Sequence, residues 1–143
     1  MIRKAKAVWR GTGRDGSGHL SSESGVLAET PYSFKTRFEN EKGTNPEELI
    51  AAAHAGCYTM ALSFILNNAG FTADIIDTEA VLTMDQVEGN PTITAVHMTT
   101  RARVPGIDAA KFAECASAAK SGCVVSRALS PSITLTLDAA LAA

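Results

Sequence analysis

The pattern of apolar and polar positions predicts one long apolar helix at the centre of the chain. In the middle of the stretch from Asn45 to Gly70 nearly every residue is small or apolar, which is typical of a helix buried on almost all sides. Asn45 is a favoured N-cap residue, Pro46 suits the first helical position, and Glu48 completes a capping-box spacing. Gly70 supplies the left-handed conformation that commonly ends a helix. We therefore expect about 24 helical residues, a length of roughly 36 Å.

Short strands are predicted before this helix. Ile2–Arg10 ends in an apolar pair, and Gly11–Gly18 contains Arg-Asp-Gly, a sequence typical of a hairpin turn. Val26–Leu27 and Tyr32–Phe38 predict two further strands, with Arg37 on the polar face of the second.

The rest of the chain predicts a hairpin, two helical segments and a last strand. These elements are strands at Thr78–Val87 and Thr92–Val104, a helix capped by Asp108 and running to about Lys120, a helical turn or two at 123–129, and a strand at Ser132–Asp138. The order predicts an α+β fold with mostly antiparallel strands, in a single domain over residues 1–143.

The central helix also predicts an assembly. A helix that is apolar on nearly every side is difficult to cover with a few short strands and one amphipathic helix. A second copy of the chain, which brings two such helices together between the sheets, covers both. We therefore expect a homodimer with an extensive, obligate-type interface.

Composition and charge exclude some classes of protein. The formal net charge is -2 and the sequence pI is about 5.9, so no basic surface for nucleic acid is expected. The N-terminus does not resemble a secretory signal. Polar residues such as His54 and Asn67 interrupt the apolar stretch, which argues against a membrane span. We expect a soluble, cytoplasmic protein.

Three cysteines, Cys57, Cys115 and Cys123, are too few and too widely spaced for a disulfide framework or a zinc site. In a reducing cytoplasm a disulfide is more often transient and catalytic. Cys123 follows Gly122 at a helix boundary, where a thiol can be mobile, whereas Cys115 lies on the apolar stripe of its helix. If a disulfide forms, Cys57 with Cys123 is therefore the better pair.

Cys57 has two interpretations, a small core residue or a reactive thiol. A buried thiol ionises only with help, and the middle of a helix offers none from the dipole, so a cation is needed. Arg37 is the candidate, although it also fits a solvated strand position. Glu47 can orient that arginine, or it can simply favour the first turn of the helix. Ten residues separate Glu47 from Cys57, about 15 Å along one helix, so we expect Arg37, Glu47 or both to come from the partner subunit.

His54 lies three residues before Cys57 on the same helical face. A Cys–His pair can activate a nucleophile, but no third group to orient the imidazole is evident, so a packed histidine is the favoured interpretation. A zinc site of Cys57, Cys123 and His54 lacks a second short ligand pair.

The chain resembles the osmotically inducible protein C branch of the OsmC/Ohr family. The run from Tyr32 to Cys57 carries most of the resemblance, including the Asn-Pro-Glu-Glu-Leu block that begins at Asn45. The segments Ser22–Leu27, Val104–Asp108 and Lys120–Cys123 match as well. The resemblance implies a thiol peroxidase that acts on organic hydroperoxides and hydrogen peroxide, built as an intertwined homodimer in which two sheets wrap two central helices.

By matching motifs, the resemblance makes Cys57 the peroxidatic cysteine and Cys123 the resolving one, with Arg37 stabilising the thiolate and Glu47 holding Arg37. It implies an external dithiol reductant such as a lipoyl group, and no metal, flavin or haem. The family commonly has proline after the resolving cysteine, where this chain has Val124. An apolar pocket with members from Phe38, Leu49, Ile50 and Met60 would favour an apolar hydroperoxide.

Two other classes of protein remain open at this stage. One is a dimer that binds a small ligand in an apolar interface pocket, with incidental cysteines. The other is a redox sensor whose disulfide signals to a partner.

Overall fold

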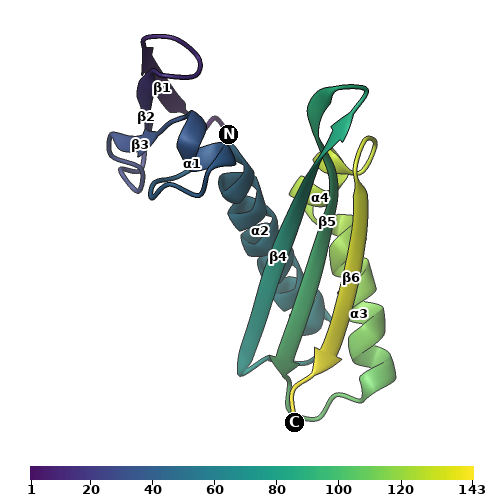
Figure 1. Ribbon diagram of the computed structural model, residues 1–143. Coiled ribbons are helices and arrows are strands. Elements are labelled where there is room, and N and C mark those ends of the chain that lie inside the picture. Colours follow the sequence, from purple (N-terminus) through teal and green to yellow (C-terminus); the bar gives the residue numbers. More distant parts are fainter. The chain divides into compact units, whose positions relative to one another are not determined.

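The computed structural model describes all of residues 1–143 and has the expected α+β fold. The chain forms two compact units, residues 1–49 and residues 50–143, and the long helix α2 begins in the first and continues through the second. The expected single domain over 1–143 stays a prediction. The elements, labelled in Figure 1, are β1 Ala5–Arg10, β2 Ser17–Ser22, β3 Thr30–Tyr32, α1 Phe34–Phe38, α2 Pro46–Asn68, β4 Ile75–Val87, β5 Asn90–Arg103, α3 Ala109–Gly122, α4 Val124–Leu129 and β6 Thr134–Leu141.

The first unit contains a three-stranded antiparallel sheet in the order β1-β2-β3. The predicted hairpin turn joins β1 to β2, and Gly16 is needed there because an added Cβ would lie 2.4 Å from the carbonyl oxygens of Arg10 and Thr12. Trp9 and Tyr32 stack across the sheet with ring centroids 5.3 Å apart.

Two strand predictions in this unit are wrong. Val26–Leu27 is not a strand, and Tyr32–Phe38 is mostly the short helix α1. Ser33 and Thr36 explain the second error, because the backbone N–H of each donates to the side-chain oxygen of the other, at 2.9 and 3.2 Å. This capping box diverts the backbone from strand pairing into a helical turn, and Arg37 therefore lies on a helix.

Helix α2 begins and ends as predicted. The backbone N–H of Glu48 donates to Asn45 Oδ1 at 2.8 Å, and Gly70 has a φ of +87° just beyond the end. The expectation that α2 is buried on almost every side is wrong for the single chain. Only one stripe is buried, namely His54, Tyr58, Leu62 and Leu66.

The other side of α2 carries apolar side chains that this chain leaves uncovered. Met60 is 61% exposed and Phe64 is 64% exposed. The physical reason is that one sheet and one other helix cover a single side of the cylinder. By length and composition alone α2 is apolar enough to cross a membrane, although its buried stripe packs into the protein core.

The second unit contains a three-stranded sheet in the order β4-β5-β6. β4 and β5 form the predicted hairpin, turning at Glu88 and Gly89, both with positive φ. β6 pairs with β5 in parallel, after a crossover through α3 and α4. One sheet face is covered by α2 and α3 (Figure 1). The core between the sheet and the helices includes Val96 and Met98 of β5 and Phe112 of α3.

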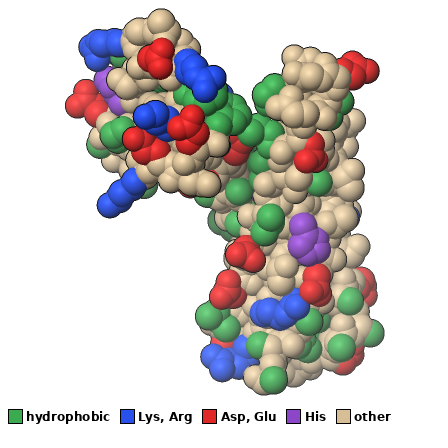
Figure 2. Space-filling model, in the orientation of Figure 1, with side chains coloured by type: hydrophobic (Ala, Val, Ile, Leu, Met, Phe, Trp, Pro, Cys, Tyr) green, Lys and Arg blue, Asp and Glu red, His purple; other side chains and the backbone are tan.

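The opposite sheet face carries polar and charged side chains (Figure 2). On it, Arg101 donates to Asp138 at 2.8 Å and His97 hydrogen-bonds Thr136 at 2.7 Å. Helix α3 has the predicted cap, since the backbone N–H of Lys111 donates to Asp108 Oδ1 at 2.8 Å. Its predicted stripe, Phe112, Cys115, Ala116 and Ala119, is buried. The sheet therefore has one apolar and one solvated face.

Candidate active site

Arg37 and Glu47 form an ion pair within the first unit. Arg37 Nε donates to both carboxylate oxygens of Glu47, at 3.2 and 3.3 Å, and Nη2 also donates to Oε1. Burial works to raise the pKa of Glu47, but the hydrogen bonds and charge of Arg37 outweigh it, so the pKa lies below its usual range. Glu47 therefore stays ionised and holds the guanidinium by two of its nitrogens.

The Arg37 guanidinium also lies over the Phe38 ring, 5.1 Å from its centroid. Phe38 in turn packs against Phe34, with ring centroids 4.7 Å apart. The arginine is thus restrained by an aromatic side chain on its own helix and by a carboxylate on the next.

Cys57 and Cys123 come together in the second unit. Cys57 is half-buried in the middle of α2, and Cys123, 1% exposed, caps the N-terminus of α4. The two thiols lie in the same packed cluster, each acts on the pKa of the other, and both are free. The structure therefore brings together the two cysteines named from the sequence, with Cys123 at the predicted helix boundary, between α3 and α4, where it is buried.

The start of α4 acts on the pKa of Cys57. Burial works to raise the pKa of the Cys57 thiol, but hydrogen bonds from Cys123 and from the backbone of Val125 and Val124 outweigh it, so the pKa lies below its usual value. The sequence interpretation that only a cation could help is therefore incomplete. The first N–H groups of a helix lack partners within it, and those of α4 face the sulfur on α2.

The pKa of Cys123 shifts in the opposite direction. Burial raises the pKa of the Cys123 thiol and the hydrogen bond with Cys57 raises it further, against smaller opposing contributions from Ser126 and Val125. Cys57 is consequently the thiol that ionises first, and Cys123 stays protonated and donates to it. This order suits Cys57 to nucleophilic attack.

His54 packs in the core and does not contact Cys57 by a hydrogen bond. Its Nε2 lies 2.8 Å from Ser126 Oγ, and burial lowers the pKa of the imidazole, so the ring is neutral near pH 7. Ser126 was missed by sequence reasoning. The only indication was a hydroxyl residue within the otherwise mostly apolar segment Val124–Leu129.

Cys115 lies in the core of the second unit, as predicted, and is 3% exposed. No three His, Cys, Asp or Glu side chains are arranged to hold a metal ion.

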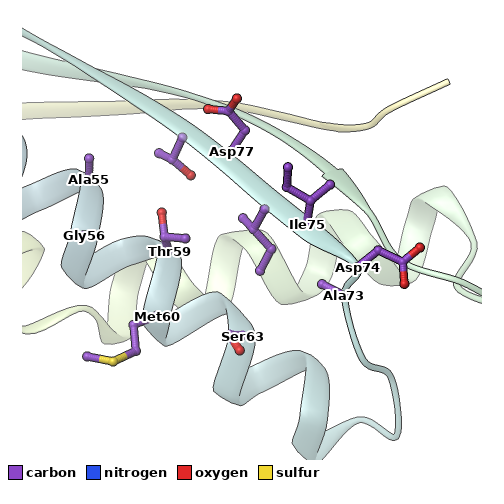
Figure 3. A pocket seen from close by; sticks show the side chains of 11 residues that line it. Ala55, Gly56, Thr59, Met60, Ser63, Ala73, Asp74, Ile75 and Asp77 are labelled. Carbon is purple, nitrogen blue, oxygen red and sulfur yellow. The ribbon is translucent and has the colours of Figure 1, made fainter.

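A groove of about 690 Å³ runs between α2 and β4 in the second unit. Gly56, which directly precedes Cys57, lies in its wall. Figure 3 shows Thr59 of α2 pointing toward β4, and Met60 pointing away from the strand. The groove therefore lies beside the segment of α2 that carries Cys57.

Comparisons with known proteins give a consistent result. Residues 39–138 match the family model of the OsmC-like proteins. The chain is 51% identical over 133 residues to peroxiredoxin OsmC of Escherichia coli (strain K12), with 93% of each chain covered. It is 30% identical to the organic hydroperoxide resistance protein OhrB of Bacillus subtilis (strain 168), covering 94% of this chain and 95% of the relative. The crystal structure of OhrB superposes with a TM-score of 0.75, covering 95% of this chain and 97% of that chain.

Proposed function

The chain belongs to the OsmC-like protein family, and from this premise we propose that it is a thiol peroxidase that reduces organic hydroperoxides and hydrogen peroxide. Its role is defence against oxidative and osmotic stress. The observation that carries the proposal is the packing of Cys57 and Cys123 in one cluster, in which the pKa of Cys57 is lowered and the pKa of Cys123 is raised. A peroxidase with a resolving thiol needs this asymmetry. One sulfur must attack the peroxide as a thiolate, while the other stays a thiol until the sulfenic acid has formed.

The reaction proceeds in three steps. The Cys57 thiolate attacks one peroxide oxygen, the O–O bond breaks, and the leaving alkoxide takes a proton to become the alcohol. Cys57 is now a sulfenic acid, and the substrate has accepted two electrons. Cys123 then attacks the Cys57 sulfur, which forms the disulfide and releases water. An external dithiol reduces the disulfide by exchange and is itself oxidised, which returns both thiols.

Arg37 supplies positive charge in the proposed mechanism. Its donors stabilise the Cys57 thiolate and the charge that develops on the peroxide oxygens, and Glu47 orients them. Glu47 precedes Cys57 by ten residues on α2, a rise of about 15 Å. We propose that the Arg37–Glu47 pair of one protomer serves Cys57 of the other.

The proposed homodimer rests on the uncovered side of α2. Met60 and Phe64 present apolar surface along the helix, and water contact with such surface is unfavourable by about 25 cal/mol per Å². An intertwined, obligate-type dimer covers both helices, and the proposed domain spans residues 1–143. The proposed substrate pocket draws its apolar lining from among Phe38, Leu49, Ile50 and Met60, which would favour apolar hydroperoxides.

The remaining expectations concern the setting of the enzyme. Family membership indicates a soluble protein, and the unpaired, oxidisable cysteines suit a reducing cytoplasm. The proposed reductant is a small dithiol or a lipoyl group carried by a protein. The chemistry uses cysteine sulfur alone and needs no cofactor.

Peroxide consumption tests the proposal. With dithiothreitol as reductant, the wild-type protein should consume cumene hydroperoxide catalytically, Cys57→Ser should abolish turnover, and Cys123→Ser should complete one turnover and then overoxidise. Cys115→Ser is the matched control and should retain activity. Intact mass spectrometry after one equivalent of peroxide should show a Cys57–Cys123 disulfide.

The two alternative functions predict different results. A dimeric ligand-binding protein would neither consume peroxide nor form the disulfide. A redox sensor would form the disulfide once but would not turn over at a useful rate with dithiols. The paired cysteines and the asymmetry of their pKa values favour the enzyme over both.

A further inference from the structure

Ser126 and His54 form a buried polar pair that has no role in the reaction steps proposed above. His54 is fully buried and Ser126 is 3% exposed. Their hydrogen bond, 2.8 Å from Nε2 to Oγ, joins α2 to the first turn of α4. It therefore connects the helix that carries Cys57 to the turn that carries Cys123.

The backbone N–H and the side chain of Ser126 both act on the Cys123 sulfur. The Ser126 backbone N–H donates to Cys123 Sγ across 3.5 Å. The Ser126 side chain also acts on the Cys123 thiol, because it lowers the pKa that burial and Cys57 raise. The chain of polar contacts is therefore His54 to Ser126 to Cys123 to Cys57.

The neutral imidazole sets which group donates and which accepts along this series of polar contacts. His54 Nδ1 is buried and has no hydrogen-bond partner. The tautomer with its proton on Nε2 leaves only a lone pair unpartnered there, whereas the other tautomer would bury an unpaired N–H. Nε2–H then donates to Ser126 Oγ, and the Ser126 hydroxyl proton is free to point at Cys123. Because burial lowers the pKa of His54, this neutral form is the one present near pH 7.

We propose that Ser126, oriented by His54, is a positioning residue for the resolving step. Once Cys57 is a sulfenic acid, the Cys123 sulfur must attack as a thiolate, and the two donors of Ser126 stabilise and aim it. The S–S bond forms as the S–O bond of Cys57 breaks, and the departing hydroxide takes the proton released by Cys123 to form water. The inference rests on the proposed function, since it concerns its second step.

Stopped-flow kinetics with cumene hydroperoxide test this assignment by separating the two steps. In Ser126→Ala, oxidation of Cys57 should stay within about twofold of wild type. Closure of the disulfide should slow about tenfold, the factor expected for loss of a hydrogen bond to a charged group. The pH midpoint of the closure rate, which reports the pKa of Cys123, should move upward, and more Cys57 should reach the sulfinic acid.

Three further variants control for structural damage. Ser126→Thr keeps the hydroxyl and should restore rapid closure. Ser130→Ala removes an exposed serine at the other end of α4 and should behave as wild type. His54→Gln should shift the pH midpoint of the closure rate in the same direction as Ser126→Ala. It is the variant to compare with wild type if Ser126→Ala does not fold.

The outcomes separate this inference from the proposed function. If the wild-type protein forms neither sulfenic acid nor disulfide with peroxide, the proposed function is wrong. If it forms both and Ser126→Ala closes the disulfide at the wild-type rate and midpoint, only the role of Ser126 is overturned. Equal slowing of both steps would show a structural role and would also overturn it.

Discussion

Cys57 and Cys123 interact in a way that moves their two thiol pKa values in opposite directions. Burial works to raise both, but the backbone of Val124 and Val125 at the start of α4 helps to lower the pKa of Cys57, whereas the interaction with Cys57 raises that of Cys123. The same contact therefore favours the thiolate on α2 and the thiol on α4. The order of the proposed reaction follows from this asymmetry.

Replacing Val124 tests the backbone donors to Cys57. Val124→Pro removes one N–H while keeping α4, because proline fits the first position of a helix. The pKa of Cys57 should rise, and its reaction with peroxide at pH 7 should slow by about tenfold, on the scale of one hydrogen bond to a charged group. Alkylation of Cys57 against pH, read by mass spectrometry, measures the shift.

Val124→Ala is the matched control for that variant. It shortens the same side chain but keeps the N–H, so its alkylation profile should match wild type. A Val124→Pro protein with an unchanged profile would show that this amide does not stabilise the thiolate.

The Arg37–Glu47 pair should make stability depend on acid pH. Because the folded-state pKa of Glu47 is lowered, its contribution is present above the unfolded-state value, near 4.5, and is lost as the pH falls through the folded-state value. Since the Arg37 and Glu47 side chains are 36% and 15% exposed, Glu47→Gln should cost only about 0.5–1 kcal/mol at pH 7. Urea unfolding from pH 7 to pH 3 should show this difference shrinking.

The control for Glu47 is Glu39→Gln, which removes a carboxylate outside any ion pair. It should leave the pH dependence of the unfolding free energy close to wild type. A constant difference between Glu47→Gln and wild type down to pH 3 would contradict the ion-pair explanation.

Mixed dimers test whether Arg37 acts across the interface. Cys57→Ser and Arg37→Ala homodimers should each be inactive or nearly so. When equal amounts are refolded together, a site shared between protomers leaves one intact site per heterodimer, so activity should return to about a quarter of wild type. If both residues of a site come from one protomer, the mixture stays as inactive as its parents.

The uncovered side of α2 should hold the dimer together. Phe64→Glu places a charge on this surface, and burying an unpaired charge is costly. Light scattering at micromolar concentration should show a dimer for wild type and a monomer for this variant, with loss of peroxidase activity. Ala118→Glu, on the exposed side of α3, should remain dimeric. A wild-type monomer would refute the assembly.

Local sequence signals predicted most of the secondary structure. Asn45 and Gly70 bound α2, Asp108 caps α3, and the alternating residues of β4 and β5 form the expected hairpin. One error arose where two local signals competed. Between Tyr32 and Phe38 the alternation of apolar residues favours a strand, but the Ser33–Thr36 capping box decides for a helix.

The sequence by itself determined which chemistry is available: cysteines at 57 and 123, an arginine at 37, a carboxylate at 47, and a helix too apolar to stand in water. Those properties belong to residue types and to spacings of a few positions, so they can be predicted without coordinates. Only the tertiary structure decided that the start of α4 faces Cys57, that Cys123 is buried, and that Ser126 joins His54 to it. These contacts join residues about 70 positions apart through packing of α2 against α4, and no periodicity along the chain encodes that distance.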